Sequence, residues 1–231
     1  MSFDSGKGAT MSCFMKDFPR CDSLIFDLDG TLWDTVAQCT RAWNEAMVEA
    51  SVEREALSEQ DMASIMGMTE EELKDVLFPG IEAAKLDPMV REAFRKECSI
   101  LASEGGCAYP SVLSGLSVLS KNYPLFIVSN CQAQYLDAFF RWSEMKEYFS
   151  DSECIGRSGL PKGQNIVNIV ERNGLQNPIY VGDTLGDERA ARFAGLPFVF
   201  VTYGFGEAEM PDYRVDSFQE LLDCLKAMQT I

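Results

Sequence analysis

The chain has 231 residues, 46% of them hydrophobic, a length and composition that suit one α/β domain with a sizeable insertion. Its 20 basic and 36 acidic side chains give a net charge of −16, which argues against nucleic acid or an anionic membrane as a partner, because both would repel it. The N-terminus lacks the apolar core of a secretory signal and no stretch has the ~18 consecutive apolar residues of a membrane span, so we expect a cytoplasmic protein.

The first predicted strand ends in two aspartates. Residues 1–20 precede it, mix Gly, Ser, Lys and Met without periodicity, and are expected to form a flexible leader. Residues 24–26 are branched or aromatic, as in a buried strand, and Asp27, Asp29 and Gly30 follow at once. Two like charges this close are costly without a positive partner, so we expect a bound cation beside them. The alternative is a loop with two solvated carboxylates.

A helical block follows the first strand. Between residue 34 and about residue 102, apolar side chains recur at helical spacing and no strand pattern interrupts them. Helix starts are predicted at three N-cap residues, the last of which precedes a proline: Ser58, Thr69 and Asp87. Gly105 and Gly106 are expected to end the block as a hinge-like linker.

Strands and helices alternate in the second half of the chain. The expected strands cover residues 125–128, 153–155, 179–181 and 198–201. Four helices are expected here. One begins at Gln132, one covers residues 162–173, one ends at Ala194, and one begins at Ser217. This alternation predicts an α/β fold, a Rossmann-like parallel sheet with helices on both faces, whose ligands bind beyond the carboxyl ends of the strands. We expect an α/β core of residues 21–34 and 107–231, with residues 35–106 inserted as an all-helical domain.

The sequence contains no histidine, which excludes Ser-His-Asp and Cys-His nucleophile systems and histidine zinc sites. Proton transfer must then use carboxylates, and metals with oxygen ligands become the expected cofactors. The eight cysteines are scattered without a Cys-x-x-Cys pair, so we expect reduced, mostly buried thiols.

Four segments resemble, in order, the motifs of the haloacid dehalogenase superfamily. They are DLDGT from Asp27, VSN around Ser129, PKG around Lys162, and GDTLGDE with Asp183 and Asp187. Over some 170 residues the chain is similar to the phosphoglycolate phosphatase-like group, whose helical cap is inserted after the first motif. Taken singly, Lys162 could be a solvated lysine at a helix start, and the last two aspartates could be loop and helix-cap residues.

The resemblance implies a Mg²⁺-dependent phosphatase acting on a small phosphorylated metabolite. Asp27 would be the nucleophile that forms an aspartyl phosphate, and Asp29 the general acid and base. Ser129 and Lys162 would contact the transferring phosphoryl group. The implied metal ligands are Asp27, the Asp29 backbone carbonyl and Asp183, with Asp187 in support. Implied substrate contacts come from two core residues and a loop of the cap: Thr31, Asn130, Gly67 and Met68.

Two alternatives stay open. A sugar phosphomutase would share the core residues, but mutases of this family carry basic residues around the cap glycine loop, where this chain has Met66 and Glu70–Glu72. A non-catalytic phosphate-binding relict is the other alternative. Dehalogenase chemistry is disfavoured because Asp29 is present. We expect a monomer, with a dimer as the alternative.

Overall fold

The computed structural model describes residues 20–229. The predicted leader therefore lies outside the described residues, apart from Arg20. None of the described helices is both long and apolar enough to cross a bilayer. The described cysteines form no disulfide, in line with the expected free thiols.

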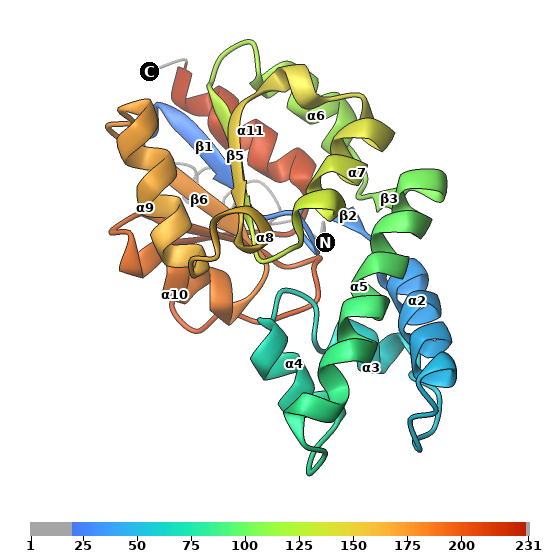
Figure 1. Ribbon diagram of the computed structural model, residues 1–231. Helices are drawn as coiled ribbons and strands as arrows, with labels where there is room; N and C mark the ends of the chain where they lie inside the picture. The colour runs from blue at the N-terminus through green and yellow to red at the C-terminus, as the bar shows by residue number, and fades with distance from the viewer. Residues whose placement is uncertain (1–19, 230–231) are drawn as a thin grey trace, which may run out of the picture.

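Six parallel strands form the central sheet, in the order β5-β4-β1-β6-β7-β8 (Figure 1). They are β1 (Ser23–Phe26), β4 (Leu125–Ser129), β5 (Phe149–Cys154), β6 (Pro178–Gly182), β7 (Phe198–Val201) and β8 (Tyr213–Val215). The predicted parallel α/β sheet is confirmed. The strand expected at 153–155 was misplaced, because β5 starts earlier and Ile155 already opens a helix.

Helices cover both faces of the sheet because successive strand residues point in opposite directions. Leu24 and Phe26 pack into one cluster and Ile25 into another. The first face carries α6 (Val112–Leu119), α7 (Ala133–Ser143) and α11 (Phe218–Gln229). The second face carries α9 (Lys162–Asn173) and α10 (Leu185–Phe193), as Figure 1 shows. Short turns of helix flank β5: η1 (Lys146–Tyr148) and α8 (Ile155–Ser158).

The inserted domain is helical, as expected, and lies beside one edge of the core (Figure 1). It contains α2 (Val36–Glu49), α3 (Glu59–Ala63), α4 (Glu70–Leu77) and α5 (Ala83–Glu104). The capping boxes predicted at Ser58 and Thr69 are both present. The helix start predicted at Asp87 is wrong: α5 begins at Ala83 with Pro88 inside it, and the Asp87 side chain pairs with Lys74 instead of capping.

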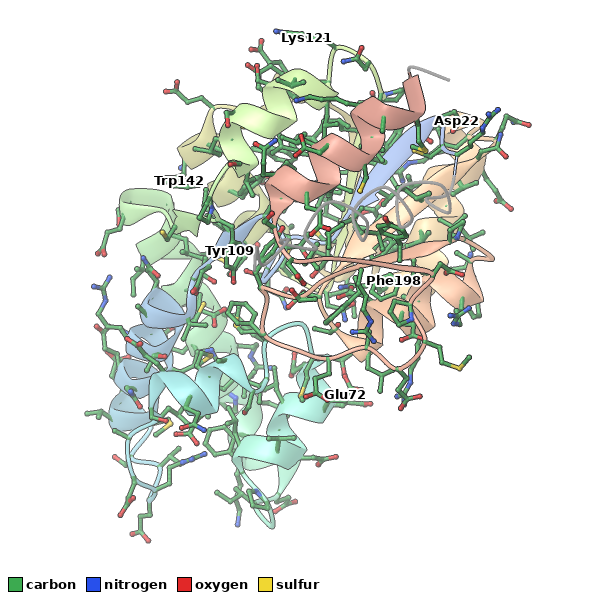
Figure 2. The ribbon with its side chains drawn as sticks, turned by 180° about the vertical axis from the view of Figure 1, so that it is seen from behind. Asp22, Glu72, Tyr109, Lys121, Trp142 and Phe198 are labelled. Carbon is green, nitrogen blue, oxygen red and sulfur yellow. The ribbon has the colours of Figure 1, made fainter. Side chains whose placement is uncertain are left out.

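Two very short strands join the inserted domain to the core. β2 (Trp33–Asp34) and β3 (Cys107–Ala108) pair antiparallel, so the chain enters and leaves the helical domain at one place. Gly105 has a φ of +73°, and a Cβ there would meet the Trp142 ring at 1.9 Å. This turn therefore requires glycine. Figure 2 shows Tyr109 and Trp142 where the helical domain meets the core. The exact domain boundaries at residues 35 and 106 stay predictions.

Candidate active site

The carboxyl ends of the central strands bring three acidic side chains together. Asp27 follows β1, and its N–H donates to Val181 O of β6 at 2.8 Å. Asp183 follows β6, and Asp187 lies in the first turn of α10. All three carboxyl groups are buried, and each offers an oxygen within 4.8 Å of the others. The sequence expectation that these aspartates meet at one edge of the sheet matches this geometry.

Lys162 is the positive group among these carboxylates. It is the first residue of α9, and its Nζ lies 2.8 Å from Asp27 Oδ1 and 2.8 Å from Asp187 Oδ1. Burial and the neighbouring Asp187 raise the pKa of Asp27 well above its ordinary value, while Lys162 opposes this shift. The nearby carboxylates raise the pKa of Lys162, so it stays charged although it is buried. It is not the solvated lysine of the alternative interpretation.

The Asp183 carboxylate is held by groups from two loops. Oδ2 accepts from Phe205 N at 2.8 Å, and Oδ1 accepts from the Thr31 hydroxyl at 3.3 Å. Gly30 has a φ of +79°, and a Cβ there would lie 2.1 Å from Asp183 Oδ2. A Cβ on Gly204 would also meet this side chain, at 2.3 Å from Asp183 Cβ. Burial and the adjacent Asp187 raise the pKa of Asp183 to about 7. The contact of Thr31 is therefore to Asp183, although the sequence placed it among the substrate contacts.

Asp187 uses both of its oxygens within the protein. Oδ1 faces Lys162 and lies 3.3 Å from the Tyr180 hydroxyl. Oδ2 accepts from the Thr184 hydroxyl at 2.7 Å, from Thr184 N at 3.0 Å and from Asp183 N at 3.2 Å. These bonds complete the capping box of α10. The arrangement suits a residue that fixes Lys162 and Asp183 in place.

Asp29 has one saturated carboxylate oxygen. Oδ1 accepts from Trp33 Nε1 at 3.1 Å, lies 3.3 Å from the Thr35 hydroxyl, and accepts from the Tyr135 hydroxyl. All three of these hydrogen bonds go to Oδ1, and the Asp29 side chain lines a cavity. Burial raises the pKa of Asp29 to about 6, and the three donors oppose that shift. A proton on this carboxyl group is therefore expected on Oδ2, the oxygen that these donors leave open.

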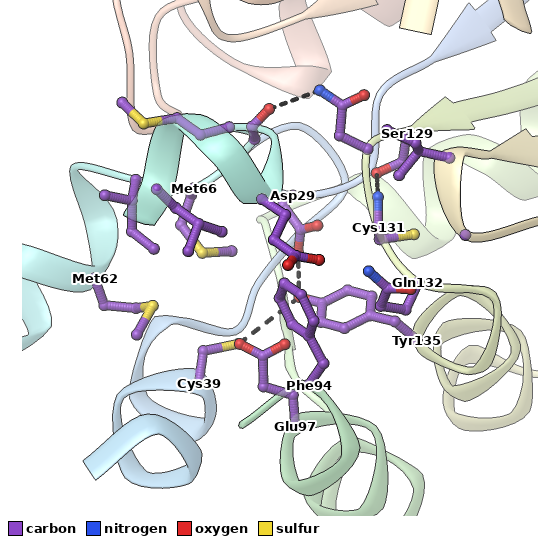
Figure 3. A pocket seen from close by; sticks show the side chains of 18 of the residues that line it. Asp29, Cys39, Met62, Met66, Phe94, Glu97, Ser129, Cys131, Gln132 and Tyr135 are labelled. Carbon is purple, nitrogen blue, oxygen red and sulfur yellow. Dashed lines mark hydrogen bonds between the residues drawn. The ribbon is translucent and has the colours of Figure 1, made fainter. Parts of the chain in front are cut away.

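A loop of the helical domain crosses over these groups. Its residues Gly67 and Met68 line two cavities, of about 280 Å³ and about 820 Å³. Asn130 of the core also lines both cavities. The Asn130 amide donates to Gly67 O at 2.9 Å, which ties the loop to the end of β4. Ser129, the last residue of β4, lines the smaller cavity and accepts from Cys131 N at 3.3 Å. Figure 3 shows Asp29 in the middle of this site, with Ser129 and Cys131 to its right and Met62 and Met66 to its left.

A sequence model described as "Haloacid dehalogenase-like hydrolase" matches residues 24–201. The chain belongs to this family. A phosphoglycolate phosphatase from Shigella boydii is 28% identical, with 91% of this chain and 95% of that protein covered. One from Agrobacterium fabrum is 26% identical over 91% of this chain and 95% of its own. The crystal structure of a predicted phosphoglycolate phosphatase from Haemophilus somnus shares the fold, with a TM-score of 0.76 at 22% identity over 88% of this chain and 97% of the other.

The acidic cluster of this hydrolase could hold a metal ion. Asp27, Asp183 and Asp187 are buried, and within residues 20–229 only Lys162 pairs with this cluster, through Asp27 and Asp187, so negative charge is in excess. A divalent cation would offset that excess, and carboxylate oxygens are the ligands that hard cations prefer. The close approach of Gly30 and Gly204 to Asp183 also leaves no room for a side chain beside its carboxylate. The donor set therefore fits a hard cation.

Several residues of the site were not found from the sequence. Trp33, Thr35 and Tyr135 hold Asp29 in place, and Glu97 of α5 lines the smaller cavity with Asp29. Glu97 had a signal, because it occupies the apolar stripe of its helix: Leu86, Val90, Ala93, Glu97 and Leu101. A carboxylate in such a stripe indicates a buried acid. The other three residues had no comparable signal.

Proposed function

We propose that this hydrolase is a Mg²⁺-dependent phosphatase that cleaves a small phosphomonoester through an aspartyl phosphate on Asp27. One observation carries the proposal: Asp27 is paired with Lys162 in the acidic cluster, while Asp29, two residues on, lines the adjacent cavity and is hydrogen-bonded through Oδ1. A nucleophilic carboxylate and a separate acid are what hydrolysis of an ester by double displacement needs. The names of the relatives, phosphoglycolate phosphatases, support the same reaction.

In the first step Asp27 attacks phosphorus, the new Asp27 O–P bond forms and the bond from phosphorus to the ester oxygen breaks. Asp29 gives its proton from Oδ2 to the departing oxygen, which leaves as an alcohol. Its pKa of about 6, raised by burial, lets it hold that proton close to neutral pH. Lys162 Nζ, 2.8 Å from Asp27 Oδ1, and the Ser129 hydroxyl would hold phosphoryl oxygens.

In the second step Asp29, now ionised, takes a proton from a water molecule that attacks the phosphoryl group. The Asp27 O–P bond breaks, and inorganic phosphate leaves. The metal ligands would be Asp27, the Asp29 backbone carbonyl and Asp183, with Asp187 orienting Lys162 and Asp183. Bound Mg²⁺ would supply positive charge that neutralises the phosphate and orients it for in-line attack.

The test is phosphate release from p-nitrophenyl phosphate with Mg²⁺, with and without excess chelator. We expect turnover that the chelator abolishes, and loss of turnover to background in Asp27→Asn. Asp75→Asn, an exposed aspartate of α4, is the matched control and should keep wild-type turnover. Full turnover in chelator, or in Asp27→Asn, would overturn the proposal. A phosphomutase would instead return the phosphoryl group to a sugar phosphate and release no inorganic phosphate from it.

A further inference from the structure

The smaller cavity lies on the leaving-group side of the reaction. This position of the cavity rests on the proposed function, in which Asp29 protonates the departing oxygen. The Asp29 side chain lines the cavity of about 280 Å³, whereas Lys162 lines the larger one. The leaving group must lie against the acid that protonates it, so it must enter the smaller cavity.

The walls of this leaving-group pocket are apolar and aromatic. Trp43 and Phe94 both line it, and their rings meet edge to face with centroids 5.8 Å apart. Met62 and Leu73 add aliphatic surface from the helical domain. Figure 3 shows Phe94 and Tyr135 between Asp29 on one side and Glu97 and Cys39 on the other. The helical domain therefore supplies much of the apolar lining, while the core adds Ser129, Asn130, Cys131, Gln132, Tyr135 and Ile155.

Glu97 is a buried carboxylate in this pocket without a cationic partner. Its side chain is 7% exposed, and Oε1 accepts from Trp43 Nε1 at 2.5 Å. No lysine or arginine within residues 20–229 lines the pocket or pairs with Glu97. The second glutamate of the lining, Glu70, already pairs with Lys74. A buried carboxyl group without a cation beside it keeps its proton, so Glu97 is neutral until a cation reaches it.

We propose that this pocket selects phosphomonoesters whose leaving group carries an ammonium group, held by the Glu97 carboxylate against the rings of Trp43 and Phe94. Carboxylate and aromatic faces both attract an organic cation, and the attraction grows when water is excluded. Burial raises the pKa of Glu97 to about 8, and a bound ammonium group would favour its ionised form.

The same pocket disfavours an anionic leaving group such as the glycolate of phosphoglycolate. That carboxylate would enter a site lined by Asp29, Glu97 and Glu70, with no positive side chain to receive it. An anion that enters this pocket loses its hydration and gains no positive partner, whereas an ammonium group can pair with Glu97, and this difference disfavours the anion. The larger cavity does contain a second cation, Arg189, which is exposed on α10.

The test is a charge series of esters of similar size: 2-aminoethyl phosphate, n-propyl phosphate and phosphoglycolate, with p-nitrophenyl phosphate as the generic ester. We expect kcat/KM to fall about tenfold or more from the amine to the propyl ester, and again to phosphoglycolate. In Glu97→Gln the ratio of amine to propyl ester should fall at least fivefold. In Glu92→Gln, a half-buried ion-paired site on the same helix, that ratio should stay at the wild-type value.

The wild-type series alone decides the matter if Glu97→Gln does not fold, which its melting temperature reports. The inference is overturned if p-nitrophenyl phosphate is hydrolysed but kcat/KM is the same for the other three esters, or is highest for phosphoglycolate. The phosphatase proposal would still stand in that case. Loss of a phosphoglycolate preference in Arg189→Gln would place the leaving group in the larger cavity instead. Failure to hydrolyse any of the four esters with Mg²⁺ overturns both proposals.

Discussion

The side-chain amide of Asn130 donates a 2.9 Å hydrogen bond to the carbonyl oxygen of Gly67, joining the core to the helical domain. Asn130 and Gly67 each line both cavities, so their hydrogen bond lies where the two cavities meet. The amide oxygen of Asn130 is buried without a partner in the described structure, which leaves an acceptor for a bound substrate.

Asn130→Ala should loosen the loop of Gly67. One hydrogen bond contributes about 0.5–1.5 kcal/mol, so we expect KM to rise up to about tenfold with a smaller change in kcat. Hydrogen exchange of the backbone amides around Met68 should speed up in the variant. Unchanged exchange and unchanged KM would show that the bond does not hold the loop in solution.

Gly30→Ala should cost far more activity than stability. A Cβ at Gly30 would meet Asp183 Oδ2 at 2.1 Å, and its φ is +79°. Gly174→Ala is the matched control, because Gly174 has a φ of +63° and nothing within 4 Å of its Cβ position. Both variants pay about 1–2 kcal/mol for left-handed backbone. We expect kcat/KM to fall a hundredfold or more in Gly30→Ala only, and equal losses in the two variants would contradict the crowding of Asp183.

Lys162→Met should destabilise the metal-free protein. It leaves the buried Asp27 and Asp187 without their cation, and breaking a buried pair costs about 3–5 kcal/mol. Added Mg²⁺ should recover part of that loss, because a cation offsets the same charge. Lys74→Met, which breaks pairs with more exposed partners, should cost about 1 kcal/mol or less and show no recovery. Denaturant unfolding with and without Mg²⁺ measures these differences. If Mg²⁺ does not stabilise Lys162→Met, the acidic cluster does not bind the cation.

The first chemical step should depend on pH through Asp29. Because its pKa is raised to about 6, the acid form is lost as the pH rises above that value. Single-turnover rates for an alkyl phosphate should fall about tenfold per pH unit above pH 6 relative to those for p-nitrophenyl phosphate, whose leaving group needs little protonation. In Asp29→Asn the two profiles should become parallel. Parallel profiles in the wild type would remove Asp29 from the acid role.

Glu97 should make stability fall with rising pH. Burial raises its pKa from 4.5 to about 8, so the folded state binds this proton more tightly than the unfolded state. Its contribution is full below pH 4.5 and is lost as the pH rises through 8. One pKa unit corresponds to about 1.4 kcal/mol. Between pH 5 and pH 8.5, the free energy of unfolding of the wild type should therefore fall by on the order of 3 kcal/mol more than that of Glu97→Gln. Thermal unfolding at both pH values, with Glu92→Gln as control, measures this, and equal pH dependence would show that Glu97 stays solvated.

The sequence was sufficient for the parallel fold class and for four strands of the sheet: β1, β4, β6 and β7. Each motif follows an apolar strand or opens a helix, and parallel strands bring those points together, which is why Asp27 and Asp183 could be expected to meet. The three-residue edge strand β8 was missed because so short a segment has no detectable alternation. Asp87 misled the prediction because its pairing with Lys74 depends on how α4 and α5 pack.

The surroundings of Asp29 could not be predicted in the same way. Tyr135 is distant in sequence and meets Asp29 only because α7 packs against the region of β2 and α5, which no local pattern encodes. The hydrogen bond from Asn130 to Gly67 likewise joins two domains. Contacts of this kind depend on tertiary packing, whereas strand ends depend on local periodicity.

The pairing of β2 with β3 makes the helical domain an exchangeable module. Both crossings into that domain occur at adjacent residues, Trp33 beside Ala108 and Asp34 beside Cys107. A different helical insert could therefore be spliced between these two points without rerouting the core chain. New leaving-group pockets could then be acquired by recombination at two neighbouring sites, with the acidic cluster inherited unchanged.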